Sequence, residues 1–260
     1  MNSYFVDWHS HLLPGIHETL TDPDESANAI LHLYENQSIR TFCMMPTFFP
    51  FRDSVAAFLL RRDRALERLA CALRKNAPMN YFSSASPRIP RIRLLHGACV
   101  ALESGCYEMD QLNKLAVPFN GIKFLPIRLP SLEFDEWIDF EINRLLYRTN
   151  VHLWFTSFEF VCKYYPFEII EKLCRISDAI FQFGYRSLED KNVQIVIKSL
   201  LERRATVLLG TSLNCLEKSY RCDLSYSLSI ARTAFTDFEY QSLIKNNLKI
   251  PQNHPKMLIV

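Results

Sequence analysis

The sequence predicts an α/β protein whose parallel strands form a distorted seven-stranded (β/α)7 barrel, similar to a TIM barrel but one strand short. Short apolar runs alternate with longer amphipathic stretches along the chain. That alternation is typical of parallel strands joined by right-handed helical crossovers. The chain has 260 residues, a length at which α/β barrels often form one domain, so we expect residues 1–260 to be a single domain.

Seven apolar runs are short enough to be strands and are separated by helical patterns. They lie near residues 4–8, 39–45, 93–100, 119–125, 151–156, 178–184 and 205–211. In a barrel of this kind the active site lies at the carboxyl ends of the strands. The residues that follow each run are therefore the candidates for function.

The helices are predicted from apolar spacing and from their caps. Residues 21–36 begin with Thr21 or Asp22 as a cap and Pro23 in the first turn, and residues 52–75 repeat apolar side chains every three or four positions. Segment 76–91, rich in Pro, Ser and Asn, is expected to be a surface loop. Further helices are predicted for residues 132–148, 165–176, 187–203 and 225–247.

Composition excludes several classes of function. The net charge of +2 is too small to indicate a nucleic-acid partner or binding to an acidic membrane surface. The sequence has no apolar run of about 18 residues and no signal-peptide pattern, so we expect a cytoplasmic protein without a membrane span. None of the eight cysteines forms a C-x-x-C pair, and buried free thiols are expected.

The most informative stretch is "DWHSHLLPGIHE", residues 7–18, which follows the first predicted strand. His9 and His11 are separated by one residue, so a strand would direct both imidazoles to one side, where they could hold a metal ion. A hydrolytic centre with two or three metals also needs carboxylates and imidazoles at other strand ends. The remaining strand ends carry mostly Thr, Phe, Cys, Lys and Leu.

The order of motifs resembles the bacterial PHP-domain tyrosine phosphatases of the CpsB/YwqE type, which are manganese-dependent enzymes of capsule and exopolysaccharide regulation. The resemblance covers about residues 4 to 250 and implies the PHP fold. The stretches that carry it are "VDWHSHLLPGIHE", "MMPTFF", "HGACV", "NGIKFLP", "FTSFEF", "FQFGYRSL" and "LGTSLN".

The resemblance also implies that most of the metal site has been replaced. His9 and His11 stand at the first two ligand positions of the family, and Glu18 stands in the acidic pair that follows. Glu159 falls near the arginine that contacts phosphate in the family. The positions of the other ligands are occupied by Thr47, Cys99, Lys123, Thr156, Thr211 and Leu213.

Two interpretations follow from these replacements. Without carboxylates, two or three Mn²⁺ ions lack both counter-charge and hard oxygen ligands, which favours a pseudoenzyme or binding protein with weak or absent Mn. The alternative is an active phosphotyrosine phosphatase with a site rebuilt around His9, His11 and Glu18, with Cys99 or Glu103 added. Cys99 as a thiolate nucleophile is disfavoured, because no arginine follows it closely in "CVALESG".

The resemblance implies a phosphotyrosine protein, such as a bacterial tyrosine kinase, as the partner. One further hypothesis concerns charge. If the strand near 119–125 ends beside the strand near 151–156, Lys123 at its end would need an anion. Glu159 is the nearest candidate, so one hypothesis is that Lys123 pairs with Glu159 or with another acid in the bore. The alternative is that Glu159 points to solvent and Lys123 pairs elsewhere.

Overall fold

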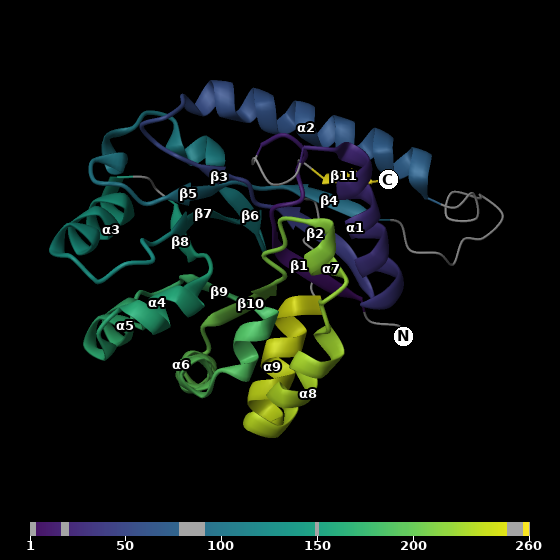
Figure 1. Cartoon of the computed structure of the whole chain (residues 1–260). Coiled ribbons are helices and arrows are strands. Elements are labelled where there is room, and N and C mark those ends of the chain that lie inside the picture. Colours follow the sequence, from purple (N-terminus) through teal and green to yellow (C-terminus); the bar gives the residue numbers. More distant parts are fainter. Residues whose placement is uncertain (1–3, 17–20, 78–91, 149–150, 249–256, 260) are drawn as a thin grey trace.

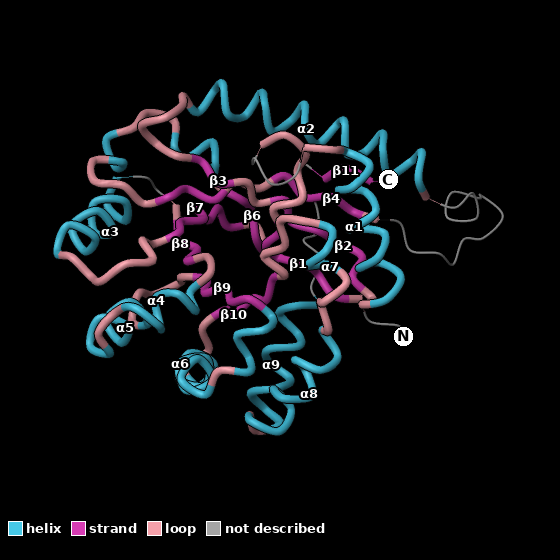
Figure 2. The backbone as a smooth tube through the Cα atoms, in the orientation of Figure 1, coloured by secondary structure: helices cyan, strands magenta, loops and turns pink. Residues whose placement is uncertain are grey.

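Parallel strands form the inner layer of the fold, and helices lie outside them (Figure 1, Figure 2). The computed structural model describes residues 4–16, 21–77, 92–148, 151–248 and 257–259. The strands are β1 (Phe5–Ser10), β2 (Ile39–Met44), β3 (Thr47–Phe48), β4 (Arg93–His96), β5 (Cys99–Ala101), β6 (Val117–Phe119), β7 (Ile122–Arg128), β8 (His152–Phe155), β9 (Ile180–Gly184), β10 (Thr206–Gly210) and β11 (Met257–Ile259).

The strands pair in two sheets. One has the order β1-β2-β4-β11, and the other has the order β10-β9-β8-β7-β5-β3, with β6 attached to β7. All pairs are parallel except β11 with β4 and β6 with β7. The predicted parallel α/β architecture is confirmed, while β6 and β11 add two antiparallel pairs that were not predicted.

The predicted strand 93–100 is interrupted, and each half belongs to a different sheet. The break falls at Gly97, where an added Cβ would lie 2.7 Å from the carbonyl oxygen of Met44. That contact leaves no room for a side chain. At the break, Gly97 N donates to Met44 O (2.9 Å) and Cys99 N donates to Pro46 O (3.0 Å), so the two segments stay hydrogen-bonded to each other between the sheets. The sheets therefore meet along the β2–β3 and β4–β5 segments.

Two hydrogen bonds join the opposite edges of the two sheets, just beyond β10. Ser212 N donates to His9 O, and His11 N donates to Leu213 O, both at 2.8 Å. These bonds place the residues after β10 beside the end of β1, although the strands form no continuous ladder there.

Helices surround the strands (Figure 1). The prediction of Asp22 as the first cap is confirmed, because its side chain accepts a hydrogen bond from Asp24 N. Two short helices, α4 and α7, were not predicted. The helices are α1 (Pro23–Asn36), α2 (Val55–Asn76), α3 (Glu136–Arg148), α4 (Phe158–Tyr164), α5 (Phe167–Cys174), α6 (Lys191–Glu202), α7 (Leu216–Ser219), α8 (Leu224–Ala234) and α9 (Asp237–Leu248), with 3₁₀ turns η2 (Cys106–Glu108), η3 (Leu112–Leu115) and η4 (Tyr185–Glu189).

The prediction of one helix over 225–247 is wrong, because the chain forms α8 and α9 with a break between them. Thr236 and Glu239 form a capping box there. Thr236 N donates to the Glu239 carboxylate at 2.7 Å, and Glu239 N contacts Thr236 Oγ1 at 3.4 Å. The "TDFE" sequence carries this signal, since Thr followed three residues later by Glu marks a helix start.

A compact apolar group, called here the inner cluster, fills the space between the strands. It contains two tryptophans, Trp8 and Trp154, whose ring centroids lie 5.9 Å apart. The inner cluster consists of Val6, Trp8, Cys43, Met45, Leu95, Cys99, Val117, Phe119, Phe124, Trp154, Ile180 and Leu208. The space between the strands is thus a packed core.

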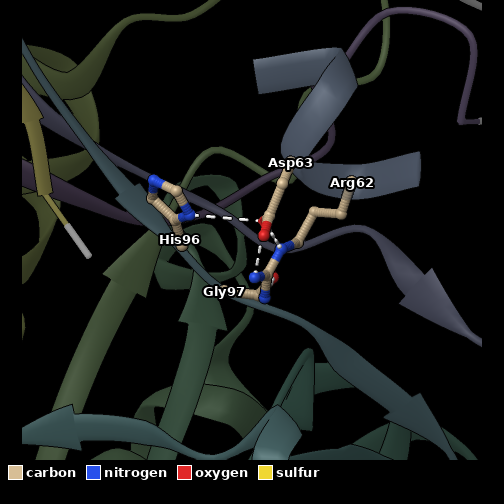
Figure 3. Close-up of polar contacts among 4 residues, drawn as sticks. All are labelled: Arg62, Asp63, His96 and Gly97. Atoms are coloured by element: carbon tan, nitrogen blue, oxygen red, sulfur yellow. Dashed lines mark hydrogen bonds and ion pairs between the residues drawn. The ribbon is translucent and has the colours of Figure 1, made fainter. Parts of the chain in front are cut away.

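Helix α2 is held to the end of β4 by a buried charge (Figure 3). Arg62 is 3% exposed and donates to the Asp63 carboxylate (2.7 Å) and to the carbonyl of Gly97 (3.3 Å). The same Asp63 oxygen lies 3.4 Å from Nδ1 of His96. A buried guanidinium needs such partners to offset its desolvation.

All eight cysteines are free, and four of them, Cys43, Cys99, Cys106 and Cys174, are buried. The expectation of free thiols is confirmed, although Cys71 is exposed. Among the helices that the structure describes, none combines the length and apolar character that a membrane crossing requires. Most of the predicted loop 76–91 lies outside the described residues.

Candidate functional site

The structure brings His9 and His11 together at the end of β1. Their Nε2 atoms lie 3.0 Å apart, and their ring centroids lie 4.6 Å apart. His9 is fully buried, whereas His11 is partly exposed. The "HSH" spacing thus directs both imidazoles to one point, as the sequence predicts.

Gln182 on β9 fixes the tautomer of His9. Its amide nitrogen donates to Phe183 O (2.8 Å), and its Oε1 accepts from Ser157 N (2.9 Å). The same Oε1 lies 2.6 Å from His9 Nδ1. Because an amide oxygen only accepts, His9 Nδ1 carries a proton and its Nε2 is an acceptor in the neutral ring. His11 Nε2 is then the donor in the contact between the two rings.

The histidine pair fits one part of a metal site. Two nitrogens about 2.1 Å from one ion, in adjacent octahedral positions, would be about 3.0 Å apart. A metal would have to replace the proton between the two Nε2 atoms. The third predicted ligand, Glu18, lies outside the described residues, as does His17.

Two of the replaced ligand positions contact each other. Cys99 Sγ lies 3.0 Å from Thr156 Oγ1, which also donates to Ile127 O at 3.1 Å. Thr47 is the ladder neighbour of Cys99 in the β3–β5 pair, and it is buried. Burial raises the pKa of the Cys99 thiol, which keeps it protonated and unsuited to nucleophilic attack.

Two other replaced positions, Thr211 and Leu213, form hydrogen bonds with residues of β1 and the residue that follows it. Thr211 donates to the two carboxylate oxygens of Asp7, from N at 2.8 Å and from Oγ1 at 2.6 Å. Burial raises the pKa of Asp7 to about 7. Leu213 is buried, and its carbonyl accepts from His11 N. These residues bind protein groups in the places where the resemblance implies metal ligands.

The hypothesis that Lys123 pairs with Glu159 is wrong. Strand β7 runs over Ile122–Arg128, so Lys123 lies at its amino end and is exposed. Glu159 lies beyond the carboxyl end of β8, in the first turn of α4, and accepts from Gly184 N at 3.2 Å. The predicted strand 119–125 straddled the turn between β6 and β7, which placed Lys123 at the wrong end.

Within the part of the chain that the structure describes, no group of three or more His, Cys, Asp or Glu side chains is arranged to hold a metal ion. His9 and His11 supply two nitrogen ligands, and the neighbouring positions supply hydroxyls, a thiol and an aliphatic side chain. Mn²⁺ prefers carboxylate oxygens and water. The described residues therefore do not fit a centre with two or three manganese ions.

Sequence reasoning missed two residues that shape the site, Asp7 and Gln182. Asp7 belongs to the quoted "DWHSH" stretch, and Gln182 begins the "QFG" part of another quoted stretch. Their roles depend on which backbone N–H groups and ring nitrogens lie nearby, and spacing along the chain does not reveal that.

A cavity of about 470 Å³ lies between α4, η4 and α7, and its wall includes Ser212 and Leu213, whose backbone groups are hydrogen-bonded to His9 and His11. Gly184, Thr211 and Leu213 line it, which places it at the carboxyl ends of β9 and β10. Four cationic side chains surround it: Lys163, Arg186, Lys218 and Arg221. Glu159 and Asp190 are the acids in its wall. We call this the carboxyl-end cavity. Its charge and position suit an anionic group.

Replacing Gly210 with alanine is expected to lower the free energy of unfolding by about 1–3 kcal/mol through overpacking. An added Cβ would lie 2.6 Å from His9 Cβ and 2.7 Å from His9 N, so β1 would have to move away from β10. Gly184→Ala is the matched control, because its nearest neighbour is the Glu159 carboxylate at 3.1 Å, the end of a flexible side chain. Urea unfolding of both variants tests this, and equal losses would contradict it.

The stability of the protein is expected to depend on pH through Glu159. Burial raises its pKa from 4.5 to about 7. Between these values the folded state holds the proton more tightly than the unfolded state, so stability falls as pH rises from about 5 to about 8. Because the side chain is partly exposed, we expect about 1–2 kcal/mol for this loss. Glu159→Gln should match the wild type at pH 5 and exceed it at pH 8 in urea unfolding. A variant less stable than the wild type at pH 8 would contradict this.

Comparison with known proteins relates this chain to a solved structure by its fold, and not by its sequence. No protein-family model matches the chain, and no curated protein matches it by sequence. The architecture is that of a parallel α/β fold with a candidate site at the strand ends.

Among solved structures, the chain is similar to one from the crystal structures of YwqE from Bacillus subtilis and CpsB from Streptococcus pneumoniae, described as unique metal-dependent tyrosine phosphatases. The TM-score is 0.64 at 16% sequence identity, over 95% of this chain and 97% of that chain. The likeness shows that this chain shares the mixed α/β fold with parallel strands of that structure.

Proposed function

We propose that the protein is a catalytically inactive member of the PHP tyrosine phosphatases that retains their one-domain fold as a binding protein. The observation that carries this proposal is the hydrogen bonding of the replaced positions. Cys99 contacts Thr156, and Thr211 binds Asp7, so these groups are committed to the protein. Without carboxylate ligands there is neither a Lewis acid nor an activated water for phosphoester hydrolysis.

The proposal includes a closed barrel of seven parallel strands. The bonds from Ser212 to His9 and from His11 to Leu213 support closure between β10 and β1, and the inner cluster supports a packed bore. It also includes a cytoplasmic location, which the eight free thiols favour because reducing compartments keep cysteines unpaired.

Hydrolysis of p-nitrophenyl phosphate, with and without added Mn²⁺, tests the loss of activity. We expect the rate of the full chain to equal that of buffer, and His9→Ala to leave it unchanged. Turnover that needs Mn²⁺ and disappears in His9→Ala would instead support the active phosphatase. The 3.0 Å spacing of the two Nε2 atoms is the observation that favours that second function.

The retained binding function is proposed to involve a phosphotyrosine protein, such as the bacterial tyrosine kinases of capsule and exopolysaccharide synthesis. Arg186 and Arg221 around the carboxyl-end cavity support this, because guanidinium groups bind phosphate oxygens in a bidentate manner, and Lys218 adds an ammonium charge.

Fluorescence anisotropy with a phosphotyrosine peptide and its unphosphorylated form tests the binding function. We expect selective binding of the phosphorylated peptide, and a loss of about tenfold or more in Arg186→Ala/Arg221→Ala, since each charge-assisted bond is worth about 1.5–3 kcal/mol. Equal affinity for the two peptides would contradict the proposal.

A further inference from the structure

A second cationic cavity lies at the opposite end of the strands from the histidine pair. It has a volume of about 490 Å³ and is lined by residues that precede or begin β7, β9 and β10, among them Ile122, Ala179 and Thr206. We call it the amino-end cavity. None of the residues that the family resemblance assigns to the metal site lines it.

Three arginines give the amino-end cavity its charge: Arg175, Arg203 and Arg204. One acid, Asp178, also lines it, which leaves an excess of two positive charges on the lining. Arg175 has a weak ion pair with Glu171, with an N–O distance of 3.8 Å and both side chains exposed. In the part of the chain that the structure describes, the side chains of Arg203 and Arg204 have no ion pair with a carboxylate.

Neutral polar groups and an apolar floor complete the cavity. Asn120, Ser177 and Thr206 contribute an amide and two hydroxyls that can donate to an anion. Phe119 and Phe124 are buried and belong to the inner cluster. The two aromatic side chains give the cavity an apolar wall, whereas the three arginines are exposed, so their attraction to an anion is weakened by salt.

We propose that the amino-end cavity binds a small anion with phosphate chemistry and several negative charges, through Arg175, Arg203 and Arg204 and without a metal ion. Planar guanidinium groups match phosphate oxygens in pairs, and three of them at one cavity favour a ligand with more than one charged group. The site is separate from the carboxyl-end cavity, so its ligand could bind whether or not the histidine site is active.

Calorimetric titration of the full chain with pyrophosphate, in buffer containing EDTA, tests this proposal. We expect saturable binding that weakens with added salt and falls about tenfold or more in Arg175→Ala/Arg203→Ala. The matched control is Lys198→Ala/Arg232→Ala, which removes the same charge from exposed positions on α6 and α8 and should bind as the wild type does. Thermal unfolding of each variant confirms that it folds.

Hydrogen exchange locates the bound pyrophosphate. We expect protection in residues 175–179 and 203–206 of the wild type, and persistence of that protection in Arg186→Ala/Arg221→Ala. Absence of saturable binding would overturn the proposal, as would equal weakening in the control variant. Loss of the protection in Arg186→Ala/Arg221→Ala would also overturn it, since the anion would then bind at the carboxyl-end cavity.

Discussion

Replacing Trp154 with alanine is expected to lower the free energy of unfolding by about 3–5 kcal/mol. Trp154 lies on β8, has no exposed surface, and packs against Trp8 in the inner cluster. Strands from both sheets contribute to this cluster, so a cavity there removes contacts from both sheets. Chemical denaturation of the variant measures the loss.

Two matched variants separate packing from other effects of Trp154. The indole nitrogens of Trp8 and Trp154 are buried and have no hydrogen-bond partner among the described residues. Trp154→Phe removes one such group and keeps an aromatic ring, so it should cost less than half as much as alanine. Tyr147→Ala removes a side chain that is 88% exposed and should cost almost nothing. A loss below about 1 kcal/mol in Trp154→Ala would contradict a packed bore.

Replacing Glu141 with alanine is expected to lower the free energy of unfolding by about 2–4 kcal/mol, because it leaves two partly buried backbone donors without an acceptor. Glu141 lies on α3 and is 1% exposed. Its carboxylate accepts from Gly105 N and from Tyr107 N (3.2 Å), and it thereby holds the η2 turn against the helix. Urea unfolding should show this loss.

The control for Glu141 lies on the same helix. Glu136→Ala removes an exposed carboxylate in the first turn of α3 and should change stability by less than about 0.5 kcal/mol. Glu141→Gln keeps an acceptor oxygen and should cost less than alanine. If Glu136→Ala and Glu141→Ala were equally destabilising, the buried carboxylate would not hold the turn.

Several strands were predictable because burial of a short apolar run decides where they lie. The apolar runs that form β2, β9 and β10 are buried, and their boundaries follow directly from burial. The break at Gly97 was not predictable, since it depends on a close approach between Gly97 and Met44 from another strand. Strand β11 pairs with β4, which precedes it by about 160 residues, and no local pattern marks that partner.

In the candidate site, too, features set by local spacing were predictable and features set by distant contacts were not. Alternation along β1 predicts that His9 and His11 meet, and they do. The assignment of Lys123 to a strand end was wrong, because Gly121 turns the chain between β6 and β7 and shifts the strand by three residues. The role of Gln182 depends on a contact across 173 residues of sequence, which spacing alone cannot predict.

The metal content of the purified full chain shows directly whether the replaced ligand positions have abolished the metal centre. Elemental analysis after exposure to Mn²⁺ and Zn²⁺, followed by removal of unbound ions, gives the number of ions per chain. We expect fewer than one tightly bound ion per chain, because His9 and His11 supply only two ligands and the described residues contain no group of three or more His, Cys, Asp or Glu side chains arranged to hold a metal ion. Two or three ions per chain, lost in His9→Ala, would contradict it.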